Sequence, residues 1–85
     1  MSWLESQTDA TVERLRRLLE SPKAFQVRDY AGGDQDFACW LLTCEAHCRL
    51  NHDVSIFDLP DIAWRDLHDD EVSPVEAVRE AVAQL

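Results

Sequence analysis

The stretch Asp36-Phe37-Ala38-Cys39-Trp40-Leu41-Leu42-Thr43-Cys44-Glu45-Ala46-His47-Cys48-Arg49-Leu50 decides the fold. At about 100° per residue it carries two apolar stripes on nearly opposite sides. Only a narrow strip through Glu45 and Arg49 is plainly polar. A helix that is apolar on most of its circumference must be surrounded by other elements. We therefore predict an all-α protein, a compact bundle of four to five short helices around a central helix at about 35–51.

Capping signals place the remaining helices. Ser2 and Glu5 have capping-box spacing, which predicts a first helix from the start of the chain to about Glu20. Residues 23–30 suit either a short helix closed by Gly32 or Gly33 or a strand, and a lone strand has no visible partner. Asp34 is the expected cap of the central helix and Asn51 its expected left-handed end. Further helices are expected at roughly 56–68 and after Ser73-Pro74-Val75-Glu76, which combines a capping Ser, Pro at the first position and Glu at the third.

Length and composition predict a single helical domain over residues 1–85. Hydrophobic residues make up 46% of the chain and charged residues 29%, which is typical of a folded domain rather than a disordered one. The chain has neither an apolar run long enough for a membrane span nor a basic, apolar signal sequence at its start. We therefore expect a cytoplasmic protein whose three cysteines stay reduced.

The formal charge of −9 is unevenly distributed. Residues 29–85 hold thirteen acidic residues and three arginines, whereas residues 1–28 have a net charge of +1. Direct binding to nucleic acid is disfavoured, because each phosphate contact needs a cation. A basic protein partner is favoured. A smaller basic patch, Arg14, Arg16 and Arg17, lies in the first predicted helix, although a solvated helix face explains it as well.

The cysteines and histidines suggest two kinds of chemistry, and helical geometry weakens both. Cys44, Cys48 and His52 fall near one face, but Cys39 points about 140° away from Cys44, so the three thiols do not converge on one ion. Cysteines in the core are inert, and no oxyanion turn lies beside them. We therefore expect no enzyme, no cofactor and no metal, with a small zinc-binding domain as an open alternative.

The run Trp64-Arg65-Asp66-Leu67-His68-Asp69-Asp70-Glu71-Val72-Ser73-Pro74-Val75-Glu76-Ala77 resembles the ending of small accessory proteins from phages and mobile elements. Such proteins often close with a Trp, an acidic turn and a capped last helix. Small acidic proteins of this type include anti-CRISPR inhibitors, some of which occupy nucleic-acid-binding surfaces. The resemblance covers under a fifth of the chain, and it implies no catalytic residue.

The leading hypothesis is a protein-protein interaction module that inhibits or sequesters a basic, nucleic-acid-binding partner by occupying its surface. Carboxylates would take the place of phosphates, and Ile62 or Trp64 would be an exposed apolar anchor. An antitoxin-like or transcriptional regulatory protein that uses the basic patch is the alternative. The predicted partner-binding residues are Asp53, Asp58, Asp61, Ile62, Trp64, Asp66, Asp69, Asp70 and Glu71.

Overall fold

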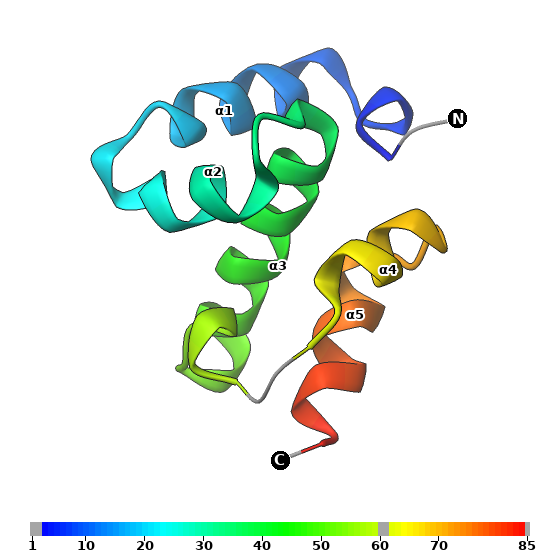
Figure 1. Ribbon diagram of the computed structural model, residues 1–85. Helices are drawn as coiled ribbons and strands as arrows, with labels where there is room; N and C mark the ends of the chain where they lie inside the picture. The colour runs from blue at the N-terminus through cyan, green and yellow to red at the C-terminus, as the bar shows by residue number, and fades with distance from the viewer. Residues whose placement is uncertain (1–2, 60–61, 85) are drawn as a thin grey trace. The chain divides into compact units, whose positions relative to one another are not determined.

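Every regular element in the described residues, 3–59 and 62–84, is helical in the computed structural model, which confirms the all-α prediction (Figure 1). The five α-helices of this part of the chain are α1 (Asp9–Leu19), α2 (Phe25–Ala31), α3 (Gln35–His52), α4 (Trp64–Asp69) and α5 (Pro74–Val82). Three short 3-10 helices accompany them: η1 (Leu4–Ser6), η2 (Pro22–Ala24) and η3 (Ile56–Asp58). None of the described helices is long and apolar enough to span a bilayer.

The chain divides into two compact units, Met1–Leu42 and Thr43–Leu85. Helix α3 begins in the first unit and ends in the second, so each unit contains about half of the predicted central helix. The prediction of one domain over residues 1–85 stays a prediction.

In the first unit, the prediction of a continuous first helix was wrong. The short helix η1 ends at Ser6, and Gln7 and Thr8 are extended before α1 begins. The predicted cap, Ser2, lies outside the described residues, and α1 is capped by Thr8, whose hydroxyl accepts a hydrogen bond from Thr11 N. The backbone N–H of Leu4 donates to the carboxylate of Asp36 at 3.0 Å.

The ambiguous stretch 23–30 is helical rather than extended, and α2 packs against α1 (Figure 1). Gly32 ends α2 with φ 63°, the left-handed conformation that glycine adopts without a steric penalty. Arg28 points back to the end of α1, where its guanidinium donates to the carbonyls of Leu19 and Ser21. This arginine therefore caps a helix and is not part of the basic patch.

Helix α3 is the predicted central helix, with its start confirmed and its end corrected. Asp34 accepts a hydrogen bond from Phe37 N at 3.1 Å, the expected capping bond. Asn51 is still helical, and the left-handed residue is Asp53, with φ 59°. The Asn51 side-chain amide donates to the carbonyl of His47 one turn earlier.

Only one of the two apolar stripes of α3 is buried along its whole length. The stripe of Phe37, Leu41, Cys44 and Cys48, together with Trp40, is at most 1% exposed. The other stripe consists of Cys39, Leu42, Ala46 and Leu50. It is buried at its start, at Cys39, but Ala46 and Leu50 near its end are exposed, Leu50 by 86%. The expectation of a helix surrounded on nearly all sides therefore holds for its first half only.

In the second unit, the prediction of one helix over 56–68 was wrong. Ser55 caps the short helix η3, and Leu59 then leaves the helical region with ψ 160°. The residue before a proline is driven out of the α conformation by the proline ring, and Leu59 precedes Pro60. Helix α4 begins only at Trp64, whereas α5 begins where the capping pattern predicted: Ser73 accepts from Glu76 N at 3.3 Å.

The carboxylate of Glu45 holds the chain that follows α3. One of its oxygens accepts from the Ser55 hydroxyl at 2.7 Å, and the other accepts from the backbone N–H of Ile56 at 3.0 Å. Arg49, one turn along α3, lies 3.5 Å from the same carboxylate. A residue of the predicted polar strip thus forms the contact between α3 and η3.

Candidate functional site

The predicted acidic surface is present on the second unit. All of its described carboxylates are exposed: Asp53, Asp58, Asp66, Asp69, Asp70 and Glu71. Asp61 lies outside the described residues. Asp53 follows the end of α3, Asp58 ends η3, and the other four belong to α4 or the turn after it. They therefore come from three separate parts of the unit rather than from one helix face.

The predicted apolar anchors, Ile62 and Trp64, are not exposed. Ile62 is 9% exposed and Trp64 only 3%. Both predictions came from projecting residues 56–68 onto one helix, and the chain is not helical between Leu59 and Ala63 in its described part. Because the projection treated residues 56–68 as one continuous helix, it assigned the buried side of α4 to the solvent-exposed face. Ile62 and Trp64 are core residues.

The arginines of the second unit are all engaged by carboxylates. Arg49 pairs with Glu45, Arg65 with Asp69 at 3.5 Å and Arg79 with Glu76 at 2.7 Å. Asp69 is therefore already neutralised in part. The exposed carboxylates of this unit that have no ion pair within the described chain are Asp53, Asp58, Asp66, Asp70, Glu71 and Glu80. These six are available to an external cation.

The end of α4 places Glu71 where neither its backbone nor its charge is favoured. Val72 N donates to the carbonyl of Leu67 and Glu71 N to that of His68, the hydrogen-bond pattern of a Schellman motif. Glu71 has φ 62°, a left-handed conformation that costs a non-glycine residue about 1–2 kcal/mol. Its carboxylate, like that of Asp70, also lies at the negative end of a helix dipole. Folding of α4 alone does not explain these acidic residues.

Replacing Glu71 by glycine is expected to stabilise the protein by about 1 kcal/mol, because glycine removes the left-handed strain. Glu71→Gln, which removes the charge and keeps the strain, should give a smaller gain of a few tenths of a kcal/mol. Gly32→Ala is the matched reverse: Gly32 has φ 63° and no atom within 4 Å of the place that a Cβ would take, so the loss should be purely conformational and similar in size. Urea denaturation of the three variants measures these differences, and a Glu71→Gly variant no more stable than the parent would contradict the strain.

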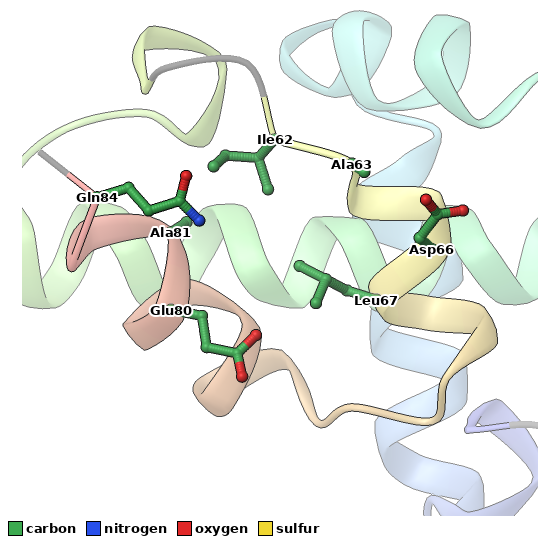
Figure 2. Close-up of a pocket in the computed structure, with 7 residues that line it drawn as sticks. All are labelled: Ile62, Ala63, Asp66, Leu67, Glu80, Ala81 and Gln84. Carbon is green, nitrogen blue, oxygen red and sulfur yellow. The ribbon is translucent and has the colours of Figure 1, made fainter.

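An open cavity of about 300 Å³ lies between α4 and α5, within the second unit (Figure 2). The side chains of Ile62 and Leu67 point into the space between the two helices. Apolar and acidic residues line it together: Ile62, Ala63, Leu67 and Ala81, with Asp66, Glu80 and Gln84. The sequence pattern singled out Asp66 but missed Glu80 and Gln84. Their only signal was spacing: Glu80 lies in α5, and Gln84 follows four residues later in the turn after it.

The cysteines are buried, as predicted, and burial raises the pKa of all three thiols above the ordinary value of 9.0. The pKa of Cys44 is raised further by Cys48, which lies one turn along α3. The Cys44 sulfur also lies 3.8 Å from the carbonyl oxygen of Pro74, a weak contact that joins α3 to α5. Across the described residues, no three His, Cys, Asp or Glu side chains are grouped so that they could hold a metal ion.

The raised thiol pKa predicts that stability falls at alkaline pH. As pH rises through 9.0, the unfolded chain releases its thiol protons while the folded chain keeps them. The folded state then binds more protons, so the free energy of unfolding decreases with pH, by up to about 1.4 kcal/mol per pH unit for Cys44 alone. Urea denaturation at a series of pH values tests this, with Cys44→Ala as the variant whose slope is shallower. Equal slopes for both proteins would contradict it.

The basic patch of α1 is also exposed. Arg14, Arg16 and Arg17 are all accessible, and Arg17 lies 3.9 Å from Glu13. Arg14 and Arg16 have no ion pair within the described chain. The unit that contains them nevertheless has more acidic than basic residues, seven against five.

No protein-family model, curated protein or solved structure matches this chain. The resemblance of residues 64–77 to small phage accessory proteins therefore stays an analogy of charge and helix capping.

Proposed function

We propose that the protein is a small acidic interaction module that inhibits or sequesters a basic, nucleic-acid-binding protein by occupying its binding surface. The anti-CRISPR-like, anti-defence inhibitor of phages is the specific version of this proposal. It involves no catalytic step.

The observation that supports the proposal is the set of exposed carboxylates that have no ion pair among the described residues: Asp53, Asp58, Asp66, Asp70, Glu71 and Glu80. The second unit carries ten acidic residues and only three arginines, each of which already has a carboxylate partner. Such an excess attracts cationic proteins over distances of about a Debye length, some 8 Å at physiological salt. The left-handed conformation of Glu71 also supports the proposal, because residues that are unfavourable for the local structure often occur at binding sites.

In this proposal the carboxylates take the positions of nucleic-acid phosphates on the partner. Charge of this kind mainly accelerates encounter and excludes wrong partners, whereas buried contacts determine how long the complex lasts. Since Ile62 and Trp64 are core residues, the residence time has to come from another part of the surface.

A capture experiment with charge variants tests the proposal. The full chain is immobilised, a host-cell lysate is passed over it, and retained proteins are eluted with increasing salt. We expect a basic partner whose retention weakens at least about tenfold between low and moderate salt and which free nucleic acid displaces. The variant Asp66→Asn/Asp70→Asn/Glu71→Gln should lose about tenfold in affinity for that partner.

The matched control removes the same number of charges from the first unit. Asp9→Asn/Glu20→Gln/Asp29→Asn changes the net charge equally at exposed positions and should retain most of the binding. Retention that ignores salt and survives both triple variants would contradict the electrostatic mechanism.

The exposed arginines of α1 support the alternative, a regulatory protein that uses the basic patch. It predicts that Arg14→Ala/Arg16→Ala/Arg17→Ala abolishes partner or DNA binding, whereas the acidic triple variant does not. The same capture experiment therefore separates the two functions.

A further inference from the structure

We propose that the cavity between α4 and α5 receives an arginine side chain of the partner. The methylene stem would lie on Ile62, Leu67 and Ala81, and the guanidinium would lie at the opening of the cavity, between Asp66 on one side and Glu80 on the other. This inference rests on the proposed function and deepens it: it supplies the buried contact that the corrected positions of Ile62 and Trp64 left without a candidate.

Apolar side chains line the inside of the cavity, and two carboxylates lie on opposite sides of it (Figure 2). Ile62 and Ala81 are buried and Leu67 is half-buried, whereas Asp66 from α4 and Glu80 from α5 are exposed. Its volume of about 300 Å³ is at the lower end of the range for ligand pockets, roughly 300–1,000 Å³. A single long side chain fits such a space better than a drug-sized ligand does.

The charges select a cationic occupant. Neither Asp66 nor Glu80 has an ion pair in the described residues, and the arginines of this unit are held by Glu45, Asp69 and Glu76. An apolar side chain entering here would take two carboxylates partly out of water without a compensating charge, which is unfavourable. A long cationic side chain covers apolar surface with its stem and keeps its head at the rim.

Arginine suits the rim better than lysine. Its guanidinium is flat, weakly hydrated and has five N–H donors, so it can lie on apolar surface and still donate to a carboxylate at the edge of the cavity. A lysine ammonium is a strongly hydrated point charge and loses more on partial burial. Arginine is also one of the residues most enriched among those that dominate the affinity of protein interfaces.

A peptide titration of the full chain tests the cavity directly. The probes are a short capped peptide, Gly-Ser-Arg-Ser-Gly, and the same peptide with citrulline, which keeps the shape of arginine but lacks its charge. We expect saturable shifts of the backbone amide resonances of Ala63, Asp66, Leu67, Glu80 and Ala81 with the arginine peptide. The citrulline peptide should bind at least about tenfold more weakly.

Three variants separate this cavity from general acidity. Asp66→Asn/Glu80→Gln should weaken peptide binding about tenfold, and Asp70→Asn/Glu71→Gln, with the same change in charge outside the cavity, less than about twofold. Ala63→Trp, at an exposed position on the cavity wall, fills the space without changing the charge and should also weaken binding about tenfold. Circular dichroism of each variant checks that it is folded.

Three results would contradict the proposed binding of arginine in this cavity. They are equal losses of affinity in the two charge variants, unchanged peptide binding by Ala63→Trp, and equal binding of both peptides. The protein is also diluted without peptide. If the amide resonances of the cavity residues shift on dilution, a second copy of the protein occupies the cavity and the proposal is contradicted. The results that contradict arginine binding in the cavity differ from those that contradict the proposed function. If a basic partner is captured in a salt-dependent manner and Ala63→Trp does not weaken its binding, the proposed function is supported and the arginine-binding cavity is not. If the peptide binds at the cavity but no basic partner is captured, the cavity is supported and the proposed function is not.

Discussion

Trp40→Ala is expected to lower the free energy of unfolding by about 3–5 kcal/mol, the largest loss expected for any single substitution described. The Trp40 side chain is 1% exposed, and its ring stacks on that of Phe37 with centroids 6.0 Å apart. Removing a buried tryptophan costs about 3–5 kcal/mol, from lost burial and from the cavity left behind. A domain of this size has a free energy of unfolding of roughly 5–10 kcal/mol in total, so the loss removes about a third of its stability or more. Urea denaturation followed by circular dichroism measures the loss.

Leu50→Ala is the matched control on the same helix. Leu50 is 86% exposed, and alanine is at least as good a helix former, so the free energy of unfolding should change by less than about 0.5 kcal/mol. If the two variants lost similar stability, α3 would not have the one-sided burial seen here.

Glu45→Ala is expected to cost about 2–4 kcal/mol, the second largest effect. The Glu45 side chain is only 13% exposed and accepts from the Ser55 hydroxyl and the Ile56 N–H. Alanine would leave both donors without their acceptor next to the core, at about 1–3 kcal/mol for each buried group. Ser55 is itself 6% exposed and caps η3 through Phe57 N, so the whole turn would loosen. Urea denaturation gives the loss, and hydrogen exchange of the Ile56 amide localises it.

Glu76→Ala tests whether any carboxylate would behave in this way. Glu76 accepts a hydrogen bond from Arg79 at 2.7 Å on an exposed helix surface, where ion pairs contribute less than about 1 kcal/mol. Ser55→Ala should reproduce part of the Glu45→Ala loss, because it breaks the same contact from the other side. Equal costs for Glu45→Ala and Glu76→Ala would contradict the assigned role.

Only part of the candidate site could be predicted from the sequence. Charge counting predicted an acidic surface, and the carboxylates of it that the structure describes are exposed, because exposed carboxylates need no particular tertiary contact. It could not show that Asp69 is paired while Asp66 is not, since both lie on α4 and differ only in whether an arginine side chain reaches them. Nor could it find Glu80, which borders the cavity only because α5 packs beside α4.

Helix existence and the best helix starts were determined by the sequence alone. Asp34 and Ser73 cap the helices that they were predicted to cap, and Gly32 ends α2, because each of these signals acts within four residues of its own position. Only the tertiary structure decided the rest. The Leu4 N–H bonds Asp36, Glu45 reaches Ser55 and Ile56, and Trp64 turns inward. These choices join residues ten or more positions apart or depend on what covers a helix face, and local propensity carries no information about either.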